Sequence, residues 1–267
     1  MDQLNIADRK FNSRLFVGTG KFPSNEMMKD ALNASETELV TVSLRRANLS
    51  KEPDQFVNIL DYIDPDKYLI LPNTSGANTA EEAIRLARLA QGAGLPKWIK
   101  LEIHPDHQYL LPDPIETLKA TEALVSENFT VLPYINADPV LAKRLQDAGA
   151  ATVMPLGSPI GSNRGMENEE QIKIIIEQAT VPVVIDAGIG KPSHATAAME
   201  LGADAVLINT AIAISSDPVQ LASAFNNAIK VGRTAYNIGL NEETINANPT
   251  SSLTGFLTEK PQELQKD

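Results

Sequence analysis

The sequence has no cysteine among its 267 residues and only three histidines. The absence of cysteine excludes disulfides, cysteine nucleophiles and thiolate-bound metal ions. No apolar run approaches the roughly 20 residues that a membrane-spanning helix needs, so no membrane association is expected. The first ten residues carry acidic groups and no apolar block, unlike a secretory signal, and a cytoplasmic location is therefore expected.

Clusters of basic residues are also missing. The chain holds 23 Lys and Arg against 34 Asp and Glu, a formal charge of −11. Because nucleic acids and anionic lipid surfaces bind clustered Lys and Arg, neither is an expected partner. A phosphorylated ligand would have to be held by backbone N–H groups or by a few side chains.

Eight short apolar runs recur along the chain, and each is followed by a turn and a helical segment. They cover residues 15–20, 39–44, 68–76, 98–103, 129–135, 151–157, 181–188 and 204–210. Strands that alternate with helices pair in parallel, because each helix returns the chain to the same end of the sheet. Eight such units predict an α/β fold, a single (β/α)8 TIM barrel, with an open doubly wound sheet as the alternative.

The flanking segments lie outside this repeat. Residues 1–14 predict a hairpin that turns at Asp8-Arg9, residues 15–239 the barrel, and residues 240–267 a polar tail. Residues 250–256 of the tail, TSSLTGF, are apolar enough to dock as a lid. A disordered end is the alternative interpretation.

Two charged residues share one face of the strand KWIKLEI, residues 97–103. Alternation places Lys100 and Glu102 with Trp98 on one side, with Cα atoms of the charged pair roughly 6.5–7 Å apart. The pair is either an ordinary interior ion pair or an amine beside an acid/base group. An apolar interior disfavours the lysine charge whereas Glu102 stabilises it, which predicts an ion pair in the empty site.

Glycine and polar residues follow the sixth, seventh and eighth strands, and barrels of this class commonly bind phosphate at the seventh and eighth loops. Gly188 and Gly190 lack the Cβ atoms that would block a close approach by phosphate oxygens, and Gly161 lies in a second glycine-rich turn. Asn209 and Thr210 add side-chain donors at the eighth strand. Asp186, at the end of the seventh strand, is either a helix N-cap or a second acid/base group.

The other candidate site residues give weaker indications of function. His104 and His107 flank Pro105-Asp106 but have no convincing third ligand, so no metal ion is expected. Arg45 and Arg46 follow the second strand, where they are either solvated or in contact with an anionic substrate.

Taken together, these motifs resemble the bacterial thiazole synthases of thiamine biosynthesis. The resemblance runs along nearly the whole chain through GTGKF (18–22), LPNTSGANTAEEA (71–83), WIKLEI (98–103), LLPDPIETLKA (110–120), VLPY (131–134), MPLGSPIGS (154–162), VPVVIDAGIG (181–190), GADAVLINTA (202–211) and SLTGF (252–256).

The resemblance implies a transferase that joins 1-deoxy-D-xylulose 5-phosphate, dehydroglycine and sulfur into the thiazole phosphate carboxylate. It implies an imine between the ketose phosphate and Lys100, with Glu102 and Asp186 as acid/base groups. The implied substrate-binding residues are Gly161, Ala187, Gly188, Asn209 and Thr210. Sulfur would arrive as the thiocarboxylate of a small ubiquitin-like sulfur-carrier protein, and the enzyme would be a homo-oligomer, a dimer or tetramer, without a cofactor.

Two rival functions use the same residues. A class I aldolase or transaldolase-like lyase also combines a strand lysine with a sugar phosphate, but it cleaves a carbon–carbon bond without a sulfur donor. A non-catalytic phosphometabolite sensor would bind the ligand unchanged and keep its affinity after Lys100→Ala.

Overall fold

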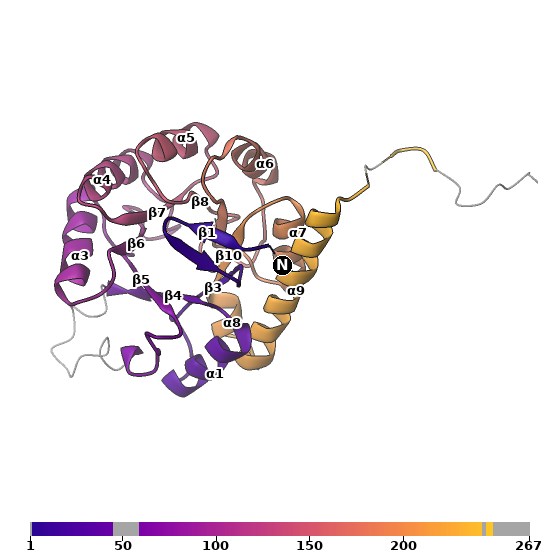
Figure 1. The fold of residues 1–267 in the computed structure, drawn as a ribbon, viewed down its shortest axis with the longest axis horizontal. Helices are drawn as coiled ribbons and strands as arrows, with labels where there is room; N and C mark the ends of the chain where they lie inside the picture. Colours follow the sequence, from indigo (N-terminus) through magenta and orange to yellow (C-terminus); the bar gives the residue numbers. More distant parts are fainter. Residues whose placement is uncertain (1, 45–58, 242–243, 248–267) are drawn as a thin grey trace, which may run out of the picture.

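The computed structural model describes residues 2–44, 59–241 and 244–247, and it contains eight parallel strands ringed by helices (Figure 1). The strands follow the order β8-β7-β6-β5-β4-β3-β10-β9. Isolated bridges from Val153 to Val183 and from Leu156 to Asp186 close the ring between β8 and β9. The predicted (β/α)8 barrel is therefore confirmed, and the open sheet is not the fold.

All eight predicted apolar runs contain a barrel strand, although the strands are shorter than the runs. They are β3 (Leu15–Gly18), β4 (Leu39–Ser43), β5 (Leu69–Asn73), β6 (Trp98–Leu101), β7 (Thr130–Ile135), β8 (Met154–Pro155), β9 (Val184–Asp186) and β10 (Ala205–Ile208). The runs continue beyond the strands as the polar turns of one end of the barrel.

Six of the eight described helices begin at a capping side chain or a proline. The eight are α1 (Asn25–Ser35), α3 (Ala80–Gly92), α4 (Pro114–Ser126), α5 (Pro139–Asp147), α6 (Glu169–Gln178), α7 (Pro192–Glu200), α8 (Thr210–Ala213) and α9 (Pro218–Ile238). Of these, α6 and α8 have neither feature. Ser24 caps α1 by accepting from the Met27 N–H. Asp113 caps α4 ahead of Pro114 at the first helical position.

The last predicted helical segment is divided in the structure. The segment that follows residues 204–210 forms two helices, because α8 ends at Ala213 and α9 begins at Pro218. Asp217 caps α9 by accepting from Gln220 N, and Pro218 cannot supply an N–H to continue a preceding helix. The long helix α9 packs beside α1 and α7 (Figure 1).

The barrel interior and the shell beneath the helices form two separate apolar clusters. Ile99, Leu101 and Ile103 lie in the cluster that contacts the helices, whereas Trp98 lies in the interior cluster. This alternation confirms the predicted faces of β6. It places Lys100 inside the barrel, above the apolar layer formed by Trp98 and its neighbours on the other strands.

An N-terminal hairpin covers the end of the barrel opposite the polar turns (Figure 1). Strands β1 (Leu4–Ile6) and β2 (Arg9–Phe11) pair antiparallel. Phe11 contacts Phe16 and Trp98 edge-on, with ring centroids 5.8 and 6.3 Å apart. The turn residues are Ala7 and Asp8 rather than Asp8-Arg9, because Arg9 pairs with Ile6 in the strand register.

Several sequence predictions fall outside the described residues, namely those for Arg45, Arg46 and the lid segment 250–256. Within the ranges that the structure describes, no helix has both the length and the apolar character needed to cross a bilayer.

The hairpin is fastened to the barrel by a charged cluster around Asp2. Its carboxylate lies 2.9 Å from Arg14 Nη2 and 2.6 Å from Arg233 Nη2 in α9. Hydrogen bonding from Arg233 is the largest effect and lowers the pKa of Asp2 well below its ordinary value. Both arginine side chains are nearly buried, at 2% and 9% exposure, so loss of their shared partner leaves buried charge unpaired.

We predict that Asp2→Asn lowers the melting temperature by about 2–4 °C, which corresponds to about 1 kcal/mol in the free energy of unfolding. The effect is limited to this size because the Asp2 side chain is 43% exposed and solvent screens its ion pairs. Because the pKa of Asp2 is lower in the folded chain than its ordinary value of 3.8, the ionised carboxylate stabilises the fold at pH values above 3.8. This stabilisation is lost as the pH falls below 3.8 toward the pKa of the folded state. The difference from wild type should therefore shrink below about pH 4. Asp8→Asn, in the turn of the same hairpin, is the control, and an equal shift in both variants would contradict the assignment.

Candidate active site

The carboxyl ends of the strands surround one cavity of about 660 Å³, a size suited to a small metabolite. The two charged residues predicted on β6 line it, and so does Asp186 at the end of β9. The predicted substrate-binding residues line the same cavity: Gly161, Ala187, Gly188, Asn209 and Thr210. The sequence thus identified residues that the fold brings together at the carboxyl ends of β6, β8, β9 and β10.

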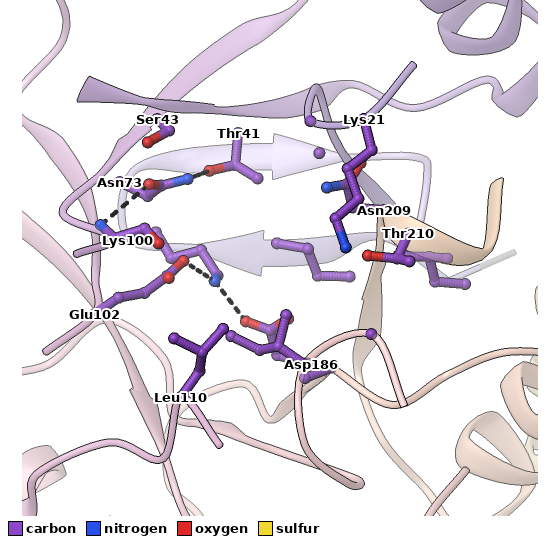
Figure 2. Close-up of a pocket in the computed structure, with 18 of the residues that line it drawn as sticks. Lys21, Thr41, Ser43, Asn73, Lys100, Glu102, Leu110, Asp186, Asn209 and Thr210 are labelled. Carbon is purple, nitrogen blue, oxygen red and sulfur yellow. Dashed lines mark hydrogen bonds and ion pairs between the residues drawn. The ribbon is translucent and has the colours of Figure 1, made fainter. Parts of the chain in front are cut away.

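The Lys100 ammonium lies between two carboxylates (Figure 2). Its Nζ atom is 2.7 Å from Asp186 Oδ2 and donates a hydrogen bond to Glu102 Oε1. All three residues are 4% exposed. The predicted ion pair between Lys100 and Glu102 is present, and Asp186 adds a second carboxylate from the opposite side of the ring.

Local backbone contacts fix the carboxyl end of β6. Lys100 is paired with Asn73 in the parallel register of β5 and β6. The Thr74 hydroxyl accepts from Glu102 N and donates to Glu102 O, at 2.8 Å each. These reciprocal bonds tie Glu102 to the neighbouring strand, so its carboxylate is held beside Lys100.

The three charges shift one another's proton affinities. Burial lowers the pKa of Lys100, but attraction by Asp186 and Glu102 outweighs burial, and the pKa lies above its ordinary value. Burial raises the pKa of Glu102, yet Lys100 and the contact with His104 dominate and lower it to about 2. Burial raises the pKa of Asp186, and the attraction of Lys100 offsets this only in part. Separated pKa values on two adjacent carboxyls are typical of acid/base sites.

Two aromatic side chains that the sequence did not single out as site residues for this chemistry complete the wall behind Lys100. The buried His104 places Nε2 3.2 Å from Glu102 Oε2. The ring of Tyr134 lies 5.2 Å from Lys100 Nζ and 5.9 Å from the His104 ring. Burial raises the pKa of Tyr134, so its phenol stays neutral beside the ammonium. Among the described residues, no group of three or more histidine or acidic side chains is arranged to hold a metal ion, and this includes His104 and His107.

The backbone that lines the cavity adopts left-handed conformations unusually often. Residues with positive φ on its wall are Lys21, Gly76, Leu110, Gly161, Asn163, Ala187 and Gly188. Such conformations cost about 1 kcal/mol or more for a residue with a side chain, and they concentrate at functional sites. Sequence patterns do not reveal this feature where the residue is not glycine, as at Lys21 and Ala187.

The glycines of the seventh loop are also required for packing, which the sequence did not predict, and their contact with phosphate oxygens stays a prediction. A Cβ on Gly188 would lie 2.0 Å from Ser158 Oγ, and one on Gly190 would lie 2.4 Å from Asn163 Cβ. Both positions need glycine because the loop after β9 packs against the loop after β8. Gly161 is the open position, since its Cβ would meet nothing closer than 3.7 Å.

Asn209 contacts the first barrel loop. With its amide nitrogen facing that loop, the side chain donates to Gly20 O at 2.9 Å and to Gly18 O at 3.1 Å. The orientation satisfies both carbonyls. Asn209 therefore holds residues 18–20 in place, which in turn positions Lys21 at the cavity (Figure 2).

Known proteins resemble this chain along most of its length. A family profile described as thiazole biosynthesis protein ThiG matches residues 5–252. Thiazole synthase 2 of Syntrophotalea carbinolica is 60% identical over 97% of this chain and 100% of its own. Thiazole synthase of Syntrophobacter fumaroxidans is 61% identical over 95% of this chain and 98% of its own.

A solved structure gives the same result for the fold. A chain of the Amycolatopsis orientalis BexX/CysO complex superposes with a TM-score of 0.80 at 32% identity. The match covers 90% of this chain and 98% of that one.

A matched pair of glycine substitutions compares Gly188, which is packed against Ser158, with Gly161, which is open to the cavity. Gly161 and Gly188 both have φ of +75°, so alanine costs about 1–2 kcal/mol at each for the backbone alone. Gly188→Ala adds the overlap with Ser158, and we expect a total loss of roughly 2–5 kcal/mol in the free energy of unfolding by denaturant titration. Equal losses for the two variants would show that loop packing does not require Gly188.

Proposed function

Because the chain belongs to the ThiG family of thiazole synthases, we propose that it builds the thiazole ring from 1-deoxy-D-xylulose 5-phosphate, dehydroglycine and sulfur. The observation that carries this proposal is the Lys100 amine, buried between Glu102 and Asp186 at the floor of the cavity. An amine in that position meets a ketone that enters from the barrel mouth.

The first step is imine formation at Lys100. The ammonium first gives a proton to a carboxylate, and Asp186 is the better acceptor because its pKa is raised whereas that of Glu102 is lowered. The free amine adds its electron pair to the ketone carbon, and the nitrogen loses a proton that passes to the carbonyl oxygen, which gives the neutral carbinolamine. The carbinolamine oxygen then leaves as water with a proton from Asp186, which forms the protonated imine.

Glu102 has a different part in this scheme. Its lowered pKa keeps the carboxylate ionised at neutral pH. An ionised carboxylate bonded to the nitrogen stabilises the positive charge of the ammonium and then that of the imine. Asp186 is thus the proton carrier and Glu102 the fixed counter-charge.

The loops at the other side of the cavity suit the phosphoryl group of the ketose phosphate. The Gly161 backbone is open to the cavity, and Ala187 and Gly188 lie on the same wall. Thr210 brings a hydroxyl to this region. Binding of the phosphoryl group there would orient the ketone toward Lys100.

The sulfur would come from a partner protein. The chain has no cysteine on which to carry a persulfide. A related BexX chain is solved in a complex with a second protein, CysO. This relationship supports delivery by a ubiquitin-like sulfur-carrier protein with a C-terminal thiocarboxylate.

The two rival functions predict different reactions. An aldolase would cleave the ketose phosphate without a sulfur donor, and a sensor would release it unchanged. When the ketose phosphate, dehydroglycine and the carrier thiocarboxylate are mixed with the protein, only a synthase consumes the thiocarboxylate.

Intact-mass measurement after borohydride reduction tests the imine. We expect the wild-type chain to gain the mass of the ketose phosphate less one water plus two hydrogens, and Lys100→Arg to gain nothing. Thiazole formation in that variant should fall at least about 10³-fold, because arginine cannot act as the nucleophile. Lys97→Arg, at an exposed lysine just before the same strand, is the control.

An adduct of the same mass on Lys100→Arg would place the imine on another lysine. No adduct on the wild-type chain would remove the Schiff-base step from the proposal.

A further inference from the structure

Two of the lysines described in the structure line the cavity, and their electrostatic surroundings differ. Lys100 is neutralised by Glu102 and Asp186. Lys21, in the loop after β3, has no ion-pair or hydrogen-bond partner among the described residues. In a chain with a net charge of −11, an unpaired lysine at a cavity wall is a cation available to a ligand.

The backbone at Lys21 is constrained toward the cavity. Its φ is +70°, in the left-handed region that residues with side chains rarely adopt. The preceding loop is held on both sides, because Thr19 N and Oγ1 both donate to Thr41 O and Asn209 donates to Gly18 O and Gly20 O. Such contacts maintain a backbone conformation that would otherwise be unfavourable.

The Lys21 side chain ends at the open glycine of the cavity. A Cβ placed on Gly161 would lie 3.7 Å from Lys21 Nζ and 3.7 Å from Thr210 Oγ1. The ammonium and the hydroxyl therefore border the same face of the Gly161 backbone. Figure 2 shows the Lys21 side chain passing Asn209 and ending beside Thr210.

This combination matches the chemistry of a phosphoryl dianion. A dianion binds more strongly where a full positive charge joins the hydrogen-bond donors, and a glycine allows its oxygens to approach the backbone. The Lys100 charge is already balanced by two carboxylates and does not supply that charge. A sulfur donor and dehydroglycine carry no phosphoryl group, so the ketose phosphate is the reactant that fits.

We propose that the Lys21 ammonium binds the phosphoryl group of the ketose phosphate, with Thr210 and the Gly161 backbone, and selects phosphorylated over unphosphorylated ketoses. Asn209 and Thr19 act as positioning residues that hold the Lys21 loop. The inference rests on the proposed function for the identity of the sugar, but the anion site itself does not depend on imine formation.

A comparison of two sugars tests this inference. The concentrations of 1-deoxy-D-xylulose 5-phosphate and of 1-deoxy-D-xylulose that give half-maximal borohydride adduct are measured for wild type and Lys21→Met. We expect Lys21→Met to raise the value about 10- to 100-fold for the phosphorylated sugar, as for loss of a charge-assisted hydrogen bond, and to leave the other unchanged. Lys21→Arg should restore most of the preference.

Matched variants separate binding from folding. Methionine keeps the length of lysine and the same backbone preference, and Lys21→Gly is favoured at φ of +70°. Both should therefore fold and both should lose the phosphate preference. Lys143→Met, at an exposed lysine of α5 with no described ion-pair partner, should behave as wild type.

Equal effects on the two sugars, or no effect on either, would overturn the assignment of Lys21. Calorimetric titration with inorganic phosphate provides a readout that is independent of the imine. Weaker phosphate binding by Lys21→Met, about tenfold or more, supports the inference even if the wild-type chain forms no adduct. Unchanged phosphate binding overturns it.

Discussion

The structure depends on one buried arrangement of charge, in which a single ammonium at the floor of the barrel mouth is shared by two carboxylates. Lys100, Glu102 and Asp186 are each 4% exposed, and a charge so far from water is tolerated only when its partners are fixed. The barrel supplies that fixation, because Lys100 and Asp186 come from different strands whose spacing is set by backbone pairing. The same arrangement explains why the pKa of Lys100 lies above its ordinary value, and why the pKa of Asp186 is raised while that of Glu102 is lowered.

The rest of the molecule keeps one end of the barrel apolar and closed and the other polar and open. Phe11, Phe16 and Trp98 fill the closed end, and the hairpin that carries Phe11 is held by the arginines around Asp2. At the open end, loops with left-handed backbone form the cavity wall. Among the described residues, Lys100 at that end is paired with two carboxylates whereas Lys21 has no charged partner, and this difference supports the proposal that a sugar phosphate is held by both lysines.

The periodicity of the chain was sufficient to predict the barrel, because eight apolar runs separated by capped helices leave few arrangements. Alternation along residues 97–103 also predicted the inward direction of Lys100 and Glu102, and the chain order predicted that Asp186 would reach the same mouth. The packing requirement for glycine at position 188 was not predictable. Ser158, which a side chain at that position would overlap, lies 30 residues away and becomes its neighbour only in the folded chain. Lys21 was missed for a similar reason. Its left-handed backbone and its distance from Gly161 arise from tertiary contacts, and its only trace in the sequence is the motif GTGKF.

The pKa of Lys100, measured by NMR of ¹³C-labelled lysine side chains and assigned with Lys100→Arg, tests the central arrangement most directly. The account predicts that the Lys100 resonance titrates above the exposed lysines in the wild-type protein. In Asp186→Asn its midpoint should fall by about 1–3 pH units, because one attractive charge is lost while burial remains. An exposed carboxylate substitution, Glu170→Gln, should not move it. A Lys100 resonance that titrates with the exposed lysines and does not respond to Asp186→Asn would contradict the account.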